Sequence, residues 1–161
     1  MAKFKVIKDV PKEDFAEAYH PELAAAVKAC GDTTNEESDQ ALKDLIVRMI
    51  KEDAPVIVPA RYPISLKQIR QGSGINILNF TTDSGEVTVS FFSSVDQYRL
   101  SLGARDGAYP VAIPIGSFFS SIVRETDFGG CVVDASEDGI GLFLSRQWID
   151  SALKESDESD D

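Results

Sequence analysis

The sequence has few of the residues from which enzymes and metal sites are most often built. It contains one histidine and two cysteines among 161 residues. A histidine-based catalytic triad, a two-histidine metal site and a histidine–cysteine pair each need partners that we cannot assemble here. Cys30 and Cys131 are far apart, and two distant cysteines do not make a disulfide framework. We therefore expect no catalytic residue, no metal, no cofactor, and two reduced cysteines that act as small core residues.

The sequence also lacks long hydrophobic runs and an excess of basic residues. Its first stretch, MAKFKVIKDVPKED, is charged throughout and has no apolar segment of the signal-peptide kind. The uncharged run at residues 108–123 contains two prolines and is too short to span a bilayer. Lysine and arginine number 16 against 27 acidic residues, which gives a formal net charge of −11. Such a surface repels nucleic-acid phosphates and anionic lipids, so we expect a cytoplasmic protein with neither partner.

The length predicts one domain, which we place at residues 1–154. Residues 155–161 follow it as an acidic tail. This tail contains no apolar side chain to bury, so we predict that it is disordered. It contains five of the acidic residues, Glu155, Asp157, Glu158, Asp160 and Asp161.

The stretch that organises the predicted fold is residues 55–92. The run Val56–Val58 is continuously apolar, which is typical of a strand covered on both faces. In residues 87–92, Val87, Val89 and Phe91 alternate with Thr88, Ser90 and Phe92, as side chains in a half-buried strand do. Gly85 lies in a turn sequence before them, so we predict a hairpin.

Helical patterns precede and follow this stretch. We expect a helix with Ser38 at its N-cap and Leu42, Ile46 and Met49 on its apolar face, and a loop at residues 63–74. A second stripe predicts a helix that packs on the sheet rather than forming an exposed docking patch. Its members are Ile115, Phe118, Phe119, Ile122 and Val123. The expected fold is α+β, a single domain with a mixed sheet that has antiparallel hairpins and is flanked by helices.

The order of these segments resembles a known family. A leading helix pair, VIVPARY, a hairpin ending in SFFSSVDQY, a PVAIP strand before a helix, and GGCVVDASEDGIGLFLS follow one another. From about Glu22 to Leu153 this is similar to the SseB protein N-terminal domain family. Asp134-Ala135 stands where members often have an asparagine–proline pair. The resemblance implies the fold, and it implies no catalytic residue because none is established for the family.

Polar residues at the ends of predicted strands are the candidate binding residues. Arg61 and Tyr62 follow the first strand, Tyr98 lies on the helix after the hairpin, and Asp134 ends the late strand. Sites often form at strand ends in sheets flanked by helices. The ordinary alternative is an Arg–Asp surface pair and two half-buried tyrosines.

These observations favour a non-catalytic protein-binding or regulatory module with a protein partner, and they leave a homo-oligomer open. Two alternatives stay open as well. One is a small-molecule-binding protein or enzyme that uses the four strand-end residues. The other is an acidic immunity or inhibitor protein, which would neutralise a basic partner through charge complementarity.

Overall fold

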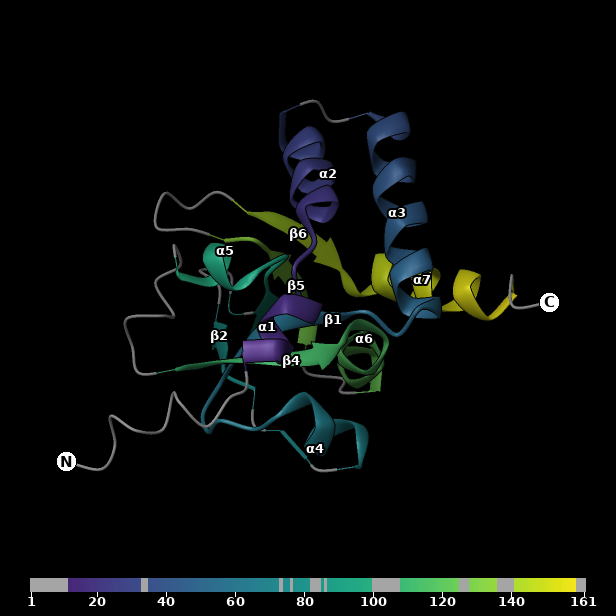
Figure 1. Ribbon diagram of the computed structural model, residues 1–161. Coiled ribbons are helices and arrows are strands. Elements are labelled where there is room, and N and C mark those ends of the chain that lie inside the picture. The colour runs from purple at the N-terminus through teal and green to yellow at the C-terminus, as the bar shows by residue number, and fades with distance from the viewer. Residues whose placement is uncertain are drawn as a thin grey trace.

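The computed structural model describes residues 12–32, 35–72, 74–75, 77–81, 85, 87–99, 108–124, 128–135 and 141–158. The described elements are α1 (Lys12–Glu17), α2 (Pro21–Asp32), α3 (Glu36–Lys51), β1 (Pro55–Ala60), α4 (Leu66–Arg70), β2 (Asn79–Thr81), β3 (Val87–Phe91), α5 (Val95–Arg99), β4 (Tyr109–Pro114), α6 (Ile115–Arg124), β5 (Phe128–Val133), β6 (Leu142–Ser145) and α7 (Arg146–Glu158). Figure 1 shows α2 and α3 side by side at one end of the molecule, and α4 at the opposite end.

The strands form two sheets that isolated bridges connect. β1 pairs with β4 antiparallel, and the second sheet has the order β2-β3-β5-β6. Within it β3 and β5 are parallel, whereas β2–β3 and β5–β6 are antiparallel pairs of neighbouring strands. The bridges Ile57–Phe92 and Ala60–Ile77 join β1 to the second sheet. The predicted α+β fold with a mixed sheet and antiparallel hairpins is therefore confirmed.

β1 separates two hydrophobic clusters, which explains its continuous apolar sequence. All six of its residues are buried. Because side chains alternate along a strand, Val56 and Val58 enter the large cluster and Ile57 enters a smaller one on the other face. The smaller cluster lies beneath α1 and includes Phe92 and Tyr98. The prediction of a strand covered on both faces is confirmed.

The large cluster is closed by α6, as its apolar stripe predicts. Phe118 and Phe119 are fully buried. Their rings meet the ring of Phe91 on β3 edge-on, with centroids 5.4 and 5.7 Å apart. This packing shows that the aromatic face of α6 belongs to the core and is not exposed for docking.

Two helix boundaries differ from the sequence prediction. α3 begins one turn earlier than expected, because the side chain of Asn35 and not that of Ser38 caps it, accepting a hydrogen bond from the backbone of Ser38 at 2.7 Å. The predicted loop at residues 63–74 contains α4. Ser65 and Gln68 form a capping box at its start, a signal that the sequence displays. Asp14, buried on α1, accepts a further hydrogen bond from Leu66.

The boundary placed after Lys154 is also incorrect, because α7 continues to Glu158. Ser156 is buried, and its hydroxyl donates to the carbonyl of Leu153 at 2.7 Å. Glu155 lies 3.5 Å from the amino group of Lys43 on α3. Residues 155–158 therefore belong to the domain. Residues 159–161, and most of the turn predicted before Val87, lie outside the described residues.

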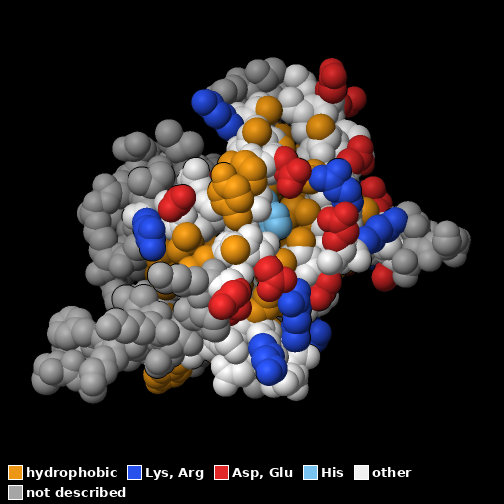
Figure 2. All heavy atoms as spheres, viewed as in Figure 1, with side chains coloured by type: hydrophobic (Ala, Val, Ile, Leu, Met, Phe, Trp, Pro, Cys, Tyr) orange, Lys and Arg blue, Asp and Glu red, His pale blue; other side chains and the backbone are white. Residues whose placement is uncertain are grey.

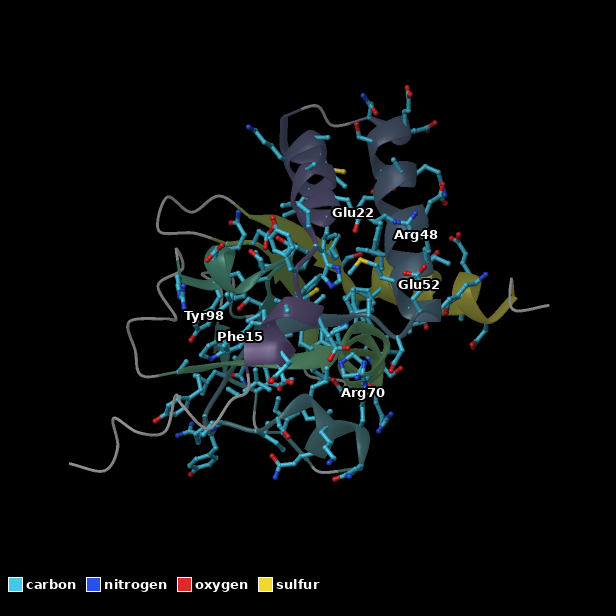
Figure 3. The ribbon with its side chains drawn as sticks, in the orientation of Figure 1. Phe15, Glu22, Arg48, Glu52, Arg70 and Tyr98 are labelled. Carbon is cyan, nitrogen blue, oxygen red and sulfur yellow. The ribbon has the colours of Figure 1, made fainter. Side chains whose placement is uncertain are left out.

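Salt bridges and hydrogen bonds connect the helices around the sheets. Arg48 on α3 lies 3.7 Å from Glu22 on α2, and Figure 3 shows the two side chains facing each other across the helix pair. Figure 3 also shows Arg70 extending from α4 toward α6. It lies within 3.6 Å of Glu17 and within 3.5 Å of Asp53. In the part of the chain that is described, no helix is long and apolar enough to cross a membrane.

Candidate functional site

The structure separates the four strand-end residues that the sequence singled out. β1 runs antiparallel to the end of β3 through the Ile57–Phe92 bridge, whereas β3 and β5 run parallel. The carboxyl ends of β1 and β5 therefore point in opposite directions. Arg61 follows the one and Asp134 follows the other, so the surface Arg–Asp pair suggested as the ordinary alternative does not fit this topology.

The other two candidates, Tyr62 and Tyr98, lie in different surroundings. Tyr62 is 64% exposed and lines a small hollow of about 480 Å³ beside Ile64 and Gln68. Tyr98 is only 3% exposed, and its ring meets that of Phe92 edge-on at 5.5 Å. Figure 3 shows Tyr98 near Phe15 of α1, within the smaller cluster. A binding role for any of the four residues stays a prediction.

Asp134 is held in a closed hydrogen-bond network at the end of β5. Its carboxylate accepts hydrogen bonds from the backbone and from the hydroxyl of Ser93, both at 2.8 Å. Its own backbone donates to Phe91 at 3.0 Å. The residue has a φ of 54°, a conformation that Asp and Asn adopt more readily than most residues. Burial raises the pKa of Asp134, and the two bonds from Ser93 offset part of that rise.

The network continues to the start of α2. The carbonyl of Ser93 accepts a hydrogen bond from the backbone of His20 at 2.8 Å, and the Nε2 atom of His20 lies 2.6 Å from the carbonyl oxygen of Pro55. His20 directly precedes α2, which begins at Pro21, and the only histidine of the chain is visible in pale blue on the face shown in Figure 2. Because the His20 ring contacts the carbonyl of Pro55 and not the Ser93 hydroxyl, the two side chains do not form a serine–histidine pair, and the arrangement ties four segments together.

The cysteines do not form a site. Both are free. Cys131 is buried in β5, where desolvation raises the pKa of its thiol and disfavours the reactive thiolate. Cys30 is partly buried and its thiol donates to the carbonyl of Ser38 at 3.3 Å. Among the described residues, no group of three or more His, Cys, Asp or Glu side chains is arranged to hold a metal ion.

A groove of about 1090 Å³ lies on another part of the surface, where α4, α6 and the end of α7 meet. We call it the isoleucine groove. Its apolar lining is made of Ile50, Ile69, Ile75, Ile77, Ile113 and Leu153. Ile113 is buried, but Ile50, Ile69, Ile75 and Ile77 are only partly buried against the core. Aliphatic side chains that remain partly in water across one surface mark a binding surface more often than scattered ones do.

One wall of the isoleucine groove is the outer face of α6, which carries small residues only. Gly116, Ser117, Ser120 and Ser121 line it, and Arg124 follows at the helix end. The opposite face of α6 holds Phe118 and Phe119 in the core. The helix therefore has one bulky face and one small face, and the small face leaves the groove open.

Two further hollows extend the isoleucine groove at its ends. The hollow beside Tyr62 shares Gly74 and Ile75 with it. A hollow of about 420 Å³ beside Gln147 shares Asp150 and Lys154 with it. The three share lining residues from the segment before α4 to the last turns of α7, and we call this stretch of surface the track.

The sequence analysis missed this surface because its residues come from separate segments. Ile69 lies in the predicted loop at residues 63–74, and no local pattern marks the isoleucines at 75 and 77 as part of a surface. One signal was present in the sequence. The outer positions of the helix at 115–124 are glycine and serine, where a solvent-facing helix usually has charged side chains.

The chain was compared with known protein families, with curated proteins and with solved structures, and none of the three comparisons gives a match. The SseB-like resemblance therefore stays a prediction.

Proposed function

We propose that this chain is a non-catalytic protein-binding module and that the isoleucine groove is its binding surface. The observation that carries the proposal is the set of partly exposed isoleucines in a groove of about 1090 Å³. Burying such aliphatic surface against a partner is favourable by roughly 25 cal/mol per Å².

The dimensions of the track favour a polypeptide over a small molecule. Sites for small ligands are hollows of roughly 300–1,000 Å³ that enclose most of the ligand. The isoleucine groove alone is about 1090 Å³, and the hollows that continue it add about 480 and 420 Å³. An elongated partner segment can occupy such a track along its length.

The alternative, a small-molecule site or enzyme built from the strand-end residues, has less support. Arg61 and Asp134 follow strands that end in opposite directions, and the Asp134 carboxylate is already occupied by Ser93. Tyr98 is buried in a cluster. These residues cannot converge on one ligand without rearrangement.

Selection from a displayed library of random peptides tests the proposal. Wild-type protein is the bait, and variants then sort the binders by location. Ser120→Arg places a long charged side chain in the middle of the groove wall. Gln40→Arg adds the same charge at an exposed position of α3 and serves as the matched control.

We expect selected peptides that bind wild type and Gln40→Arg alike and bind Ser120→Arg at least about tenfold more weakly, a difference of about 1.4 kcal/mol. If a partner is steered by the net charge of −11, binding should also weaken as salt rises. Recovery of no binder, or of binders that Ser120→Arg does not affect, would refute the assignment of the groove.

A further inference from the structure

Strand β6 ends the four-stranded sheet, and its outer edge lacks the usual protection. Among the described strands, β5 is its one neighbour. Natural edge strands usually have a charge, a proline or a bulge that stops another strand from pairing with them. Residues 141–145, GLFLS, contain no charged residue and no proline, and the pairing of β6 with β5 runs without a bulge. By contrast, β4 of the other sheet contains Pro110 and Pro114 and contacts α1 and α4.

The backbone of Phe143 points away from β5. In the ladder, Phe143 is paired with Val132 and Leu144 with Cys131. The carbonyl oxygen of Leu144 lies so close to Gly130 on β5 that a Cβ added there would be 2.2 Å from it. Leu144 therefore directs its backbone groups toward β5, and because these directions alternate along an antiparallel strand, Phe143 directs its N–H and C=O outward. Apart from the sheet ladder, no backbone hydrogen bond among the described residues involves Phe143.

The side chains of β6 have different surroundings on its two faces. Leu144 is buried in the large cluster, which also contains Leu23 and Val27 of α2. Phe143 lies on the other face and is 49% exposed. Its ring extends over Gly130, where an added Cβ would be 2.9 Å from the Cζ atom. The rest of the ring stays in water beside the open edge of the strand.

The sequence of β6 is complementary to itself in the antiparallel direction. Leu142-Phe143-Leu144 reads the same from both ends. A two-fold axis at Phe143 would place this residue opposite its own copy in a hydrogen-bonded pair, and Leu142 of each chain opposite Leu144 of the other. Aromatic side chains that face each other across two strands stabilise the pair. The net charge of −11 opposes contact between two copies, but the uncharged residues 141–145 bring no like charges together.

We propose that two copies of this chain associate by antiparallel pairing of their β6 strands, which joins their four-stranded sheets into one. No residue of β6 lines the isoleucine groove, so this dimer leaves the groove open and does not rest on the proposed function. One short strand pair buries little surface, so the dimer is weak and its population depends on protein concentration.

Sedimentation velocity over about a hundredfold range of concentration tests the proposal. Phe143→Lys adds a charge of the kind that protects natural edge strands, and Gln40→Lys adds it at an exposed position of α3 as the matched control. We expect wild type and Gln40→Lys to shift alike from monomer to dimer, and Phe143→Lys to dimerise at least about tenfold more weakly. A monomer at every concentration would overturn the proposal, even if β6 binds a peptide of another protein. A dimer that Phe143→Lys does not affect would overturn the assignment to β6.

Disulfide cross-linking tests the register and does not depend on the folding of Phe143→Lys. Cys30→Ser first removes the native thiol that is only partly buried. In the proposed pair the two Cα atoms of residue 143 are about 5.5 Å apart, which a disulfide can span. Oxidation should therefore join Phe143→Cys chains into a covalent dimer and leave Gln40→Cys chains monomeric at the same concentration. No covalent dimer, or equal amounts with both variants, would overturn the pairing at Phe143.

Discussion

The network at Asp134 is polar and closed by its own hydrogen bonds, whereas the isoleucine groove is apolar and open to solvent. At Asp134, the carboxylate that the sequence marked as a candidate binding group is already bonded, with Ser93 donating to it twice. In the groove, apolar side chains that usually complete a core remain partly in water. Polar side chains at strand ends can therefore be structural, while the open surface lies among residues with no chemistry of their own.

The largest expected change in stability concerns α6, because one face of this helix packs in the core and the other lines the groove. Phe118→Ala should lower the free energy of unfolding by about 3–5 kcal/mol, since it removes a fully buried ring from the large cluster. Ser117→Ala, on the exposed face one residue earlier, should change it by less than about 0.5 kcal/mol. Urea denaturation measures both. Equal effects would show that the two faces of α6 are not distinct.

The network at Asp134 should show an intermediate effect. Asp134→Ala leaves the buried backbone N–H of Ser93 without its acceptor and should cost about 1–3 kcal/mol. Asp134→Asn keeps an acceptor oxygen and tolerates the φ of 54°, so it should lose much less. Thermal and urea unfolding of the two variants measure these two losses of stability. A neutral Asp134→Ala would mean that the network does not support the fold.

The end of α7 should contribute less than either. A chain that stops after Lys154 loses the buried Ser156 and the contact of Glu155 with Lys43. Because exposed ion pairs contribute little, the expected loss is about 1 kcal/mol, or about 2–4 °C in melting temperature. A chain that stops after Glu158 is the matched control and should melt like the full chain. If both truncated chains melt at the same temperature, residues 155–158 do not stabilise the domain and belong to the acidic tail.

The smallest expected effect concerns pH. Burial raises the pKa of Asp134 in the folded state, so the folded protein keeps that proton to a higher pH than the unfolded chain. Between the two pKa values the free energy of unfolding should therefore fall as pH rises. Asp134→Asn removes this component, so the difference between wild type and variant should decline across that interval and then level off. A difference that grows with pH would contradict the raised pKa.

The sequence predicted the parts of the fold that depend on local periodicity. The six buried residues of β1 and the aromatic stripe of α6 follow from the spacing of apolar side chains. The prediction of a half-buried strand at β3 is wrong, because Thr88 and Ser90 are buried along with the apolar residues of a strand that lies between β2 and β5. The pairing of strands was harder to predict from the sequence. Nothing local in β1 identifies β4, some fifty residues later, as its neighbour.

The candidate sites also combine features that are local in the sequence with features that only the fold brings together. Asp134 could be singled out from its position after a strand, but its partner Ser93 follows the parallel strand β3, and this neighbourhood is known only from the fold. The isoleucine groove draws on α3, α4, α6, α7 and the segment before β2. No window of the sequence contains that surface. Short local signals do exist: the capping box of Ser65 and Gln68 would have predicted α4, which forms one side of the groove.

The parallel pairing of β3 with β5 has a consequence for how the chain folds. The segment between these two strands contains α5, β4 and α6, and β4 pairs with β1 in the other sheet. Such long-range pairings must overcome loop-closure entropy before any contact rewards them, so folding is slow compared with that of helical bundles. Until β5 docks, the edge of β3 that pairs with it stays open. Stopped-flow refolding should take milliseconds to seconds, and a microsecond phase that accounts for the whole signal would contradict folding limited by long-range pairing.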